Sequence, residues 1–267
     1  MTNLLTEKYQ KIERLLADYG KVAVAFSGGA DSHFLLTVSC KTLGPERVKA
    51  FHASSTLLSR EEEMQIAPLC LSLGCEVHNF NFEPLAWPEF TANPPERCYL
   101  CKRHIYQTFT DSRWVKEDGF LLLDGTNFDD LSADRPGLKA IREFEVQTPL
   151  AEVGLTKKEI RRLSRDFGLV TWDKPSASCF ATRISAGAHI DEKKIRFIEQ
   201  GENFLKGLGC GAVRVCPDQA MVKIFLPKSS MGIVAKKSVV STINDYFSVR
   251  GFADVRIDPV GRPDVEI

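Results

Sequence analysis

The 267-residue sequence has no net charge, because 35 basic side chains are balanced by 35 acidic ones. Such a balance gives no overall field that attracts nucleic acid or a membrane surface, so we expect neither as a partner. The sequence also has no apolar run of membrane-spanning length; its densest cluster is Phe120-Leu121-Leu122-Leu123. The charged residues between Glu7 and Arg14 exclude a signal peptide at the start of the chain. Repeats and low-complexity tracts are absent, which favours a globular protein.

A glycine-rich turn, Ser27-Gly28-Gly29-Ala30-Asp31-Ser32, lies between an expected strand at 21–26 and an expected helix near 32–43. We call residues 27–32 the glycine loop. Its glycines allow positive φ and bring backbone N–H groups close to an anion, while the two serine hydroxyls and the helix N-terminus add further donors. No lysine follows the glycines, so the loop is not that of kinases and GTPases, and the G-x-G-x-x-G fingerprint is absent too. The acid Asp31 at this place suits a magnesium-bound pyrophosphate.

The motif S-G-G-x-D-S after a strand resembles the PP-loop of the ATP pyrophosphatases. That resemblance implies cleavage of ATP between its α- and β-phosphates, with ATP and Mg²⁺ as ligands. The residues expected to hold the triphosphate with Mg²⁺ are Ser27, Gly28, Gly29, Asp31 and Ser32. The alternative to a nucleotide-binding loop is a glycine turn without a ligand at the end of a strand. A nucleotide site in a chain without a signal peptide indicates the cytoplasm.

Strand-like and helical segments alternate in the first two thirds of the chain. Expected strands lie at 21–26, 48–53, 75–82 and 120–124, and expected helices near 32–43, 60–73 and 99–115, after an opening amphipathic helix. Alternation with short turns predicts an α/β fold with a parallel, Rossmann-like sheet. Ligands bind at the carboxyl ends of such strands, so Gly125, Thr126 and Asn127 are expected beside the AMP part of ATP. Thr156 and Glu159 form a capping-box pattern that predicts a helix to Phe167.

The pattern changes near Asp191. A long helix to Leu208, paired strands at 212–216 and 220–226, a helix near 229–247 and a last strand at 254–258 predict a small α+β unit. We therefore expect a PP-loop domain over residues 1–188 and a second domain over 189–267. The second domain would bind substrate or mediate oligomerisation, and we expect a homo-oligomer.

Eight cysteines are more than usual, and in a reducing compartment they favour chemistry or metal binding over disulfides. Cys98 and Cys101 form a C-x-x-C pair at the start of an expected helix, and Cys179 lies in the segment 174–183. The flanking cations Arg97 and Lys102 favour thiolate.

Several interpretations of these three cysteines stay open. They could bind one metal with His104 or Cys75 as a fourth ligand, act as a thioredoxin-like redox pair, or leave one corner of an iron–sulfur cubane open for a substrate atom. They could also be small buried residues. Core packing is the better interpretation for the remaining five, which are Cys40, Cys70, Cys75, Cys210 and Cys216.

An ordered set of further motifs resembles the LarE family over about residues 10 to 200. The motifs are Asp124-Gly125-Thr126-Asn127-Phe128-Asp129-Asp130, Asp134-Arg135-Pro136-Gly137, Thr148-Pro149-Leu150, Leu155-Thr156-Lys157-Lys158-Glu159-Ile160-Arg161, and Lys174-Pro175 through Cys179 and Arg183. The family comprises PP-loop sulfur transferases in the synthesis of the nickel-pincer nucleotide cofactor. The resemblance implies that ATP adenylates a carboxylate of a pyridinium biscarboxylate mononucleotide and releases pyrophosphate. Sulfur then displaces AMP and leaves a thiocarboxylate.

Within that resemblance, Cys179 matches the sulfur-bearing cysteine. In one subgroup this cysteine gives up its own sulfur and becomes dehydroalanine. In another, a C-x-x-C pair joins it to hold a [4Fe-4S] cluster whose free iron carries an added sulfide, and a sulfide donor is then needed. The presence of Cys98 and Cys101 favours the cluster version.

Other residues are weaker candidates. Arg135, Arg183 and Arg214 are possible anion donors for the substrate, each with a surface salt bridge as the alternative. Asp129 and Asp130 could orient metal or substrate, or simply begin a solvated helix.

Three rival functions share some of these features. A tRNA thiolase uses the same loop and cluster but needs a basic face or an RNA-binding appendage, and the sequence shows neither. An amide synthetase with an ammonia donor would leave the cysteines incidental. A non-catalytic nucleotide-binding sensor would keep the phosphate turn without a use for Asp31 or three cysteines.

Overall fold

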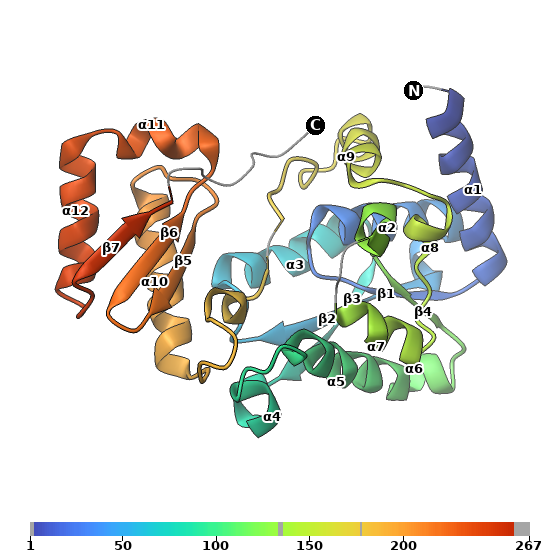
Figure 1. The fold of residues 1–267 in the computed structure, drawn as a ribbon. Helices are drawn as coiled ribbons and strands as arrows, with labels where there is room; N and C mark the ends of the chain where they lie inside the picture. Colours follow the sequence, from blue (N-terminus) through green and yellow to red (C-terminus); the bar gives the residue numbers. More distant parts are fainter. Residues whose placement is uncertain (1–2, 133–135, 177, 259–267) are drawn as a thin grey trace.

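The computed structural model describes residues 3–132, 136–176 and 178–258, and its first domain is built on a parallel sheet (Figure 1). Four parallel strands lie in the order β3-β2-β1-β4. The strands are β1 (Val22–Ala25), β2 (Val48–Ser55), β3 (Glu76–Phe82) and β4 (Leu121–Asp124). The register pairs Ala25 with Phe51 on one side and with Asp124 on the other. The predicted α/β fold with a Rossmann-like parallel sheet is confirmed.

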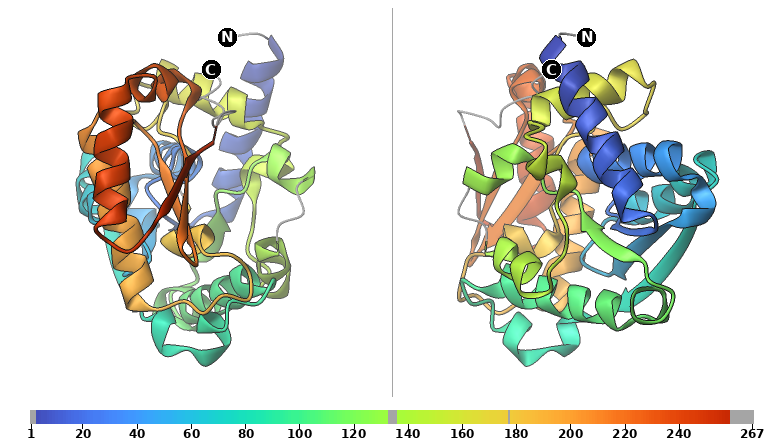
Figure 2. Two further views of the ribbon diagram at one scale, coloured as in Figure 1. Left: turned by 60° about the vertical axis from the view of Figure 1, so that its left-hand side comes forward. Right: turned by 90° about the vertical axis from the view of Figure 1, so that its right-hand side faces the viewer.

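Helices cover both faces of this sheet. Their bounds are α1 (Asn3–Tyr19), α2 (Ala30–Leu43), α3 (Arg60–Ser72), α4 (Pro88–Thr91), α5 (Arg97–Asp111), α6 (Arg113–Lys116), α7 (Gly137–Glu143), α8 (Pro149–Glu152) and α9 (Lys157–Asp166). Val22 and Val24 point into a core with α1, α2 and α9, whereas Ala23 points into a core with α5 and α7. This division follows from strand geometry, because successive side chains face opposite sides of a sheet. Figure 2 shows α1 and α5 on opposite sides of the domain.

The region 84–95 connects β3 to α5. It contains a 3₁₀ turn at Pro84–Ala86 and the short helix α4, each with a proline at its start. Proline is tolerated there because the first helical N–H groups have no intrahelical partner.

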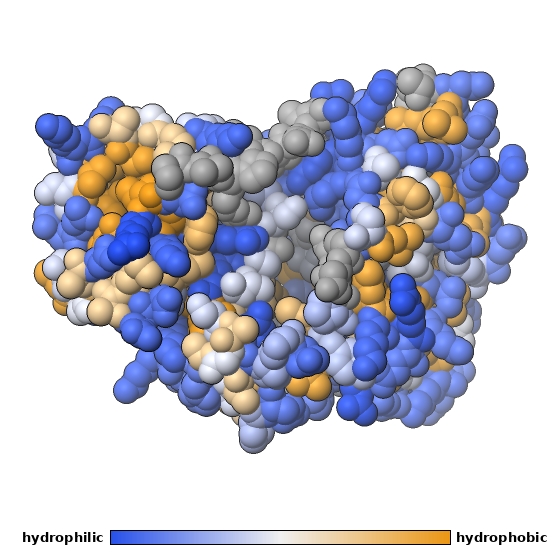
Figure 3. Space-filling view, in the orientation of Figure 1, coloured by the Kyte–Doolittle hydropathy of each residue, from blue (hydrophilic) through white to orange (hydrophobic). Residues whose placement is uncertain are grey.

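The second unit has its own sheet and core. Strands β5 (Arg214–Asp218), β6 (Met221–Phe225) and β7 (Asp254–Ile257) lie in that order, with β5 and β6 paired as expected and antiparallel. Helix α10 (Glu192–Gly207) packs on this sheet. The helix expected near 229–247 is instead two helices, α11 (Met231–Val234) and α12 (Lys237–Ser248), because Lys236 adopts an extended conformation between them. Apolar side chains gather on the outer face of this unit (Figure 3).

A small apolar cluster lies where the two units meet. Leu57 of the first unit packs there with Phe180, Ile184 and Ile198. The segment after Cys179 is therefore packed between the two units. That segment includes a 3₁₀ turn at Phe180–Arg183.

Candidate functional site

The glycine loop joins β1 to α2 at the carboxyl edge of the sheet. Gly28 has φ +68°, and a Cβ there would lie 2.9 Å from Ile66 Cδ1 of α3. Both the backbone conformation and the close approach therefore require glycine. The N–H of Ser27 lies 3.4 Å from Ser32 Oγ, and the two serine hydroxyl oxygens lie 3.2 Å apart, so the loop folds back on the first turn of α2.

The turn after β4 packs against the N-terminal turn of α2. A Cβ on Gly125 would lie 3.0 Å from the backbone nitrogen of Ser32. Asp124 accepts a hydrogen bond from the N–H of Thr126 at 2.8 Å and one from the hydroxyl of Tyr106 at 2.5 Å. The sheet therefore brings Gly125, Thr126 and Asn127 beside the glycine loop, although these residues are nearly 100 positions away in the sequence.

Two buried polar atoms at this edge have no hydrogen-bond partner among the described residues. One is Oδ1 of Asp31, and the other is Nδ2 of Asn127, whose side chain is fully buried. Buried polar groups are normally paired, so an unpaired acceptor and an unpaired donor at one edge are typical of a ligand site. A carboxylate oxygen is a ligand that Mg²⁺ prefers, and an amide N–H suits a nucleotide oxygen or ring nitrogen. The residues present therefore fit both Mg²⁺ and a nucleotide.

The sequence analysis missed Lys157. Its ammonium lies 2.7 Å from Oδ2 of Asp31, although the two residues are 126 positions apart. Lys157 is the first residue of α9, after the confirmed capping box of Thr156 and Glu159. A cation at a helix N-terminus is opposed by the helix dipole, and this unfavourable position is the signal that could have identified it.

A second lysine holds the loop from the other side. The ammonium of Lys174 donates to the carbonyl of Gly28 at 3.0 Å and to Gln65 at 3.2 Å. Asp129, by contrast, accepts the backbone N–H of Lys157 at 2.8 Å, so it caps α9. Asp130 accepts the N–H of Asn127 at 3.3 Å. In this structure both carboxylates accept hydrogen bonds from backbone N–H groups.

The three predicted cysteines lie together. Cys98 and Cys101 are the second and fifth residues of α5, and Cys179 directly precedes the turn at Phe180–Arg183. Burial, with smaller contributions from the neighbouring Cys179 and Cys98, raises the pKa of Cys101 to about 12. Burial also raises the pKa of Cys179, which Arg97 opposes. The expected thiolate stabilisation by Arg97 and Lys102 is therefore outweighed by burial, and both thiols are protonated at neutral pH.

Arg97 links the two segments that carry these cysteines. Its guanidinium donates to the carbonyl of Ala181 at 3.0 Å and to the side chain of Asn93, and lies 3.9 Å from the sulfur of Cys98. Asn93 is buried, has φ +56° and donates to the carbonyls of Ser185 and Ala188. The sequence analysis named Arg97 only as a cation beside the cysteines and did not single out Asn93, because these carbonyl partners lie about 90 residues away.

No group of three or more His, Cys, Asp or Glu side chains in residues 3–132, 136–176 and 178–258 is placed to hold one metal ion. His104 instead stacks on Trp87 and pairs with Glu89, and Cys75 is in the core. The zinc alternatives with these fourth ligands are therefore wrong. A cubane differs, since each thiolate binds a separate iron and the sulfurs stand farther apart than around one ion. Three neighbouring thiols from two segments fit that donor set.

The predicted substrate arginines have different surroundings. Arg183 is buried and paired with Glu202 at 2.8 Å, and it also donates to the carbonyls of Ser178 and Cys179. The surface salt bridge considered for it is therefore wrong, because the pair is buried. Arg214 begins β5. Arg135 lies outside the described residues.

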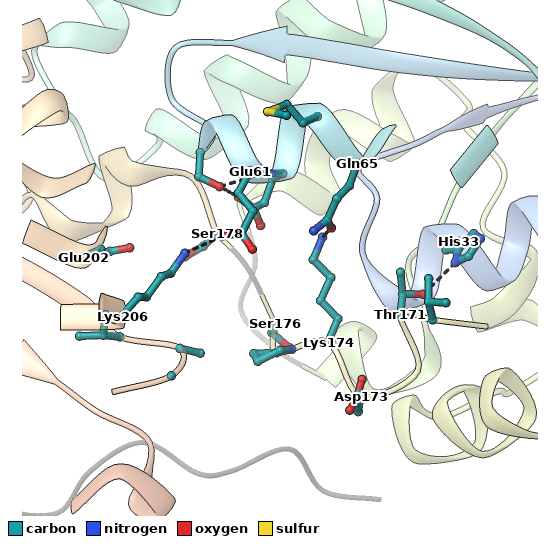
Figure 4. A pocket seen from close by; sticks show the side chains of 18 of the residues that line it. His33, Glu61, Gln65, Thr171, Asp173, Lys174, Ser176, Ser178, Glu202 and Lys206 are labelled. Atoms are coloured by element: carbon teal, nitrogen blue, oxygen red, sulfur yellow. Dashed lines mark hydrogen bonds and ion pairs between the residues drawn. The ribbon is translucent and has the colours of Figure 1, made fainter. Parts of the chain in front are cut away.

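Arg183 and Arg214 both line a cavity of about 1380 Å³ between α3, the segment 168–176 and the second unit (Figure 4). Lys206 and Glu61 bridge its two walls at 3.2 Å. His33 also lines it, bonded through Nδ1 to Thr171 at 2.8 Å. The glycine loop and the three cysteines do not line this cavity.

Within the described part of the chain, no helix has the length and apolar character needed to cross a membrane.

These features define a Rossmann-like α/β protein whose sheet and glycine loop have the arrangement of a PP-loop domain. No family model matches the sequence. It is 30% identical, over 87% of its length and 83% of the relative, to a pyridinium-3,5-bisthiocarboxylic acid mononucleotide synthase of Lactiplantibacillus plantarum. The chain therefore belongs to the LarE family.

Two further relatives are uncharacterized proteins. One, from Synechocystis, is 30% identical over 97% of this chain and 96% of the relative. The other, from Methanocaldococcus jannaschii, is 28% identical over 89% of each.

Proposed function

We propose that this protein is an ATP-dependent sulfur transferase that makes a thiocarboxylate from a pyridinium-3,5-biscarboxylate mononucleotide. The family supports a sulfur-transferring synthase, since the named relative makes a bisthiocarboxylic acid mononucleotide. The observation that carries the ATP part is the buried Oδ1 of Asp31, which has no partner in the described residues and lies beside the glycine loop. Its neighbours are the N-terminus of α2 and the turn at Gly125.

In the first step, a carboxylate oxygen of the substrate attacks the α-phosphorus of ATP, and pyrophosphate leaves. The N–H groups of the glycine loop and the positive end of α2 stabilise the charge that develops on the leaving group. Asp31 would hold Mg²⁺, and Lys157 would then be released toward the phosphates. Gly125, Thr126 and Asn127 would bind the AMP part.

In the second step, sulfur attacks the acyl carbon, and AMP leaves. Cys98, Cys101 and Cys179 would hold a [4Fe-4S] cluster, which when bound supplies an iron that can carry sulfide. The protein's own part is to bring the segments of Cys98 and Cys179 together through Arg97. Arg183 fixes the backbone of Cys179. Arg214 would contribute to the binding of the substrate phosphate.

The test is anaerobic purification with iron and sulfide analysis, followed by incubation with ATP and the biscarboxylate mononucleotide. We expect about four irons per chain and pyrophosphate release that depends on the carboxylate. Release of phosphate instead of pyrophosphate would overturn adenylation. A protein without iron after reconstitution that loses H₂S at Cys179 during turnover, seen by mass spectrometry, would replace the cluster with the sacrificial route.

A further inference from the structure

His52 is a buried histidine beside the glycine loop that the proposed reaction does not use. It lies on β2 and is only 2% exposed. Its Nδ1 is 2.9 Å from the carbonyl oxygen of Phe26, and its Nε2 is 3.0 Å from Oε2 of Glu63 on α3. Both ring nitrogens of this one side chain therefore have partners on two different elements.

The partners determine the protonation state of His52. A backbone carbonyl only accepts, so Nδ1 carries a hydrogen. Glu63 accepts from the hydroxyl of Ser54 at 3.1 Å and from the N–H of Ser55 at 3.1 Å, and it lies in the first turn of α3. A carboxylate that receives these two donors acts only as an acceptor, so Nε2 donates to it as well. His52 is then an imidazolium.

The carbonyl of Phe26 belongs to the peptide unit that starts the glycine loop. The N–H of this same unit is that of Ser27, which faces Ser32 Oγ at 3.4 Å. The unit is therefore held at its oxygen by His52 and at its nitrogen by the first turn of α2. Because Gly28 follows with a positive φ, rotation of this peptide unit would redirect the N–H groups that face the phosphates.

We propose that His52 is a positioning residue for the phosphate-binding loop, and that it acts as an imidazolium held by Glu63. The pair connects the start of the loop to α3, which also contacts Gly28 through Ile66. The inference rests on the proposed binding of ATP by this loop, but the charge state of His52 does not.

The charge state is tested by long-range ¹H–¹⁵N spectra of the full chain labelled at histidine, at pH 7. The chain has only five histidines, and the His52 signals are those lost in His52→Asn. We expect both ring nitrogens to be protonated in the wild type. In Glu63→Gln we expect one protonated nitrogen, because a neutral amide no longer stabilises the cation. A neutral His52 ring in the wild type would overturn the imidazolium.

The positioning role is tested by the Kd for Mg²⁺·ATP, measured by calorimetry. His52→Asn keeps an N–H at the position of Nδ1, whereas His52→Gln keeps one at the position of Nε2. We expect His52→Asn to bind ATP within about threefold of the wild type, and His52→Gln to bind about tenfold more weakly, as for one lost hydrogen bond.

The matched control is His78→Gln, since His78 lies on β3 with its Nε2 3.4 Å from Glu76, away from the loop. Thermal denaturation of each variant separates unfolding from a local effect. Equal affinities of His52→Gln and His78→Gln would overturn the positioning role. A wild type that does not bind ATP would instead overturn the proposed function and leave the charge state of His52 standing.

Discussion

Lys157 Nζ lies 2.7 Å from Asp31 Oδ2, which joins the first residue of α9 to the first turn of α2. The glycine loop lacks the lysine of kinase-type loops, and the tertiary structure supplies a cation to the same place from 126 residues away. In the absence of ATP, Lys157 neutralises the acid that we propose binds Mg²⁺. In the proposed reaction, Asp31 would hold Mg²⁺ in place of Lys157, and the ammonium of Lys157 would then face the phosphates.

Lys157→Met should therefore weaken ATP binding by about tenfold, because the phosphates lose one charge-assisted contact. The measurement is the Kd for Mg²⁺·ATP by calorimetry. Lys158→Met is the control, since the neighbouring side chain is exposed on the same helix. Identical Kd values for the two variants would show that Lys157 does not contact ATP.

Asp31→Asn should abolish the Mg²⁺ dependence of pyrophosphate release, because an amide is a much weaker ligand for a hard cation than a carboxylate. Pyrophosphate release is measured across a Mg²⁺ titration. Asp129→Asn is the matched control; it should keep the Mg²⁺ response, since Asp129 caps α9. A normal Mg²⁺ titration for Asp31→Asn would remove this residue from the metal site.

Cys98→Ser, Cys101→Ser and Cys179→Ser should each lose most of the iron and labile sulfide of the reconstituted protein, because three thiolates are needed to fix the cluster. The electron paramagnetic resonance signal of the reduced protein is the second measurement. Cys216→Ser should retain the wild-type iron content, since Cys216 lies on β5 and was assigned to packing. Full iron in the Cys101 variant would contradict the proposed donor set.

His33 predicts a pH dependence of stability. Burial, with a smaller effect of Lys174, lowers the pKa of His33 to about 4 from its ordinary value of 6.5. The folded state therefore favours the neutral ring, and this stabilisation is complete above pH 6.5 and is lost as the pH falls toward 4.

Between pH 7.5 and 4.5, the free energy of unfolding of the wild type should fall by about 2 to 3 kcal/mol more than that of His33→Gln. Urea denaturation at both pH values measures this difference. Parallel losses in the two proteins would mean that His33 keeps an ordinary pKa.

The buried pair of Arg183 and Glu202 predicts a non-additive effect. Arg183→Met leaves Glu202 buried without its cation, which should cost about 3–5 kcal/mol of stability. The double variant Arg183→Met with Glu202→Leu removes both charges and should recover a large part of that loss. Denaturation of the single and double variants measures the coupling. Simple additivity would indicate that the two side chains do not interact in solution.

Much of the fold could be predicted from local pattern. The alternation of strands and helices, the capping box of Thr156 and Glu159, and the pairing of β5 with β6 are all confirmed. These features depend on residues close in sequence, such as a hydroxyl cap three positions from its partner. The break at Lys236 between α11 and α12 was missed, because no proline or glycine marks it.

The candidate site was predicted less completely than the fold. The glycine loop was identified because its residues are contiguous, and the three cysteines because of their spacing and the family resemblance. Lys157, Lys174, Arg97 and Asn93 were not identified as contacts, since each acts on a segment that is distant in the chain. The arginine Arg183 was considered as a surface cation, but only packing decides whether a guanidinium is buried.

The sequence alone determined the parallel α/β class, the glycine loop and the chemistry available from its side chains, because periodicity and contiguous motifs are local properties. The tertiary structure determined which charged and polar side chains lie next to one another. It pairs Lys157 with Asp31, brings Cys179 beside Cys98 and Cys101, and leaves Asp31 Oδ1 and Asn127 Nδ2 buried without partners in the described residues. Burial then reverses the expected thiolate state of Cys101, because desolvation outweighs the nearby cations.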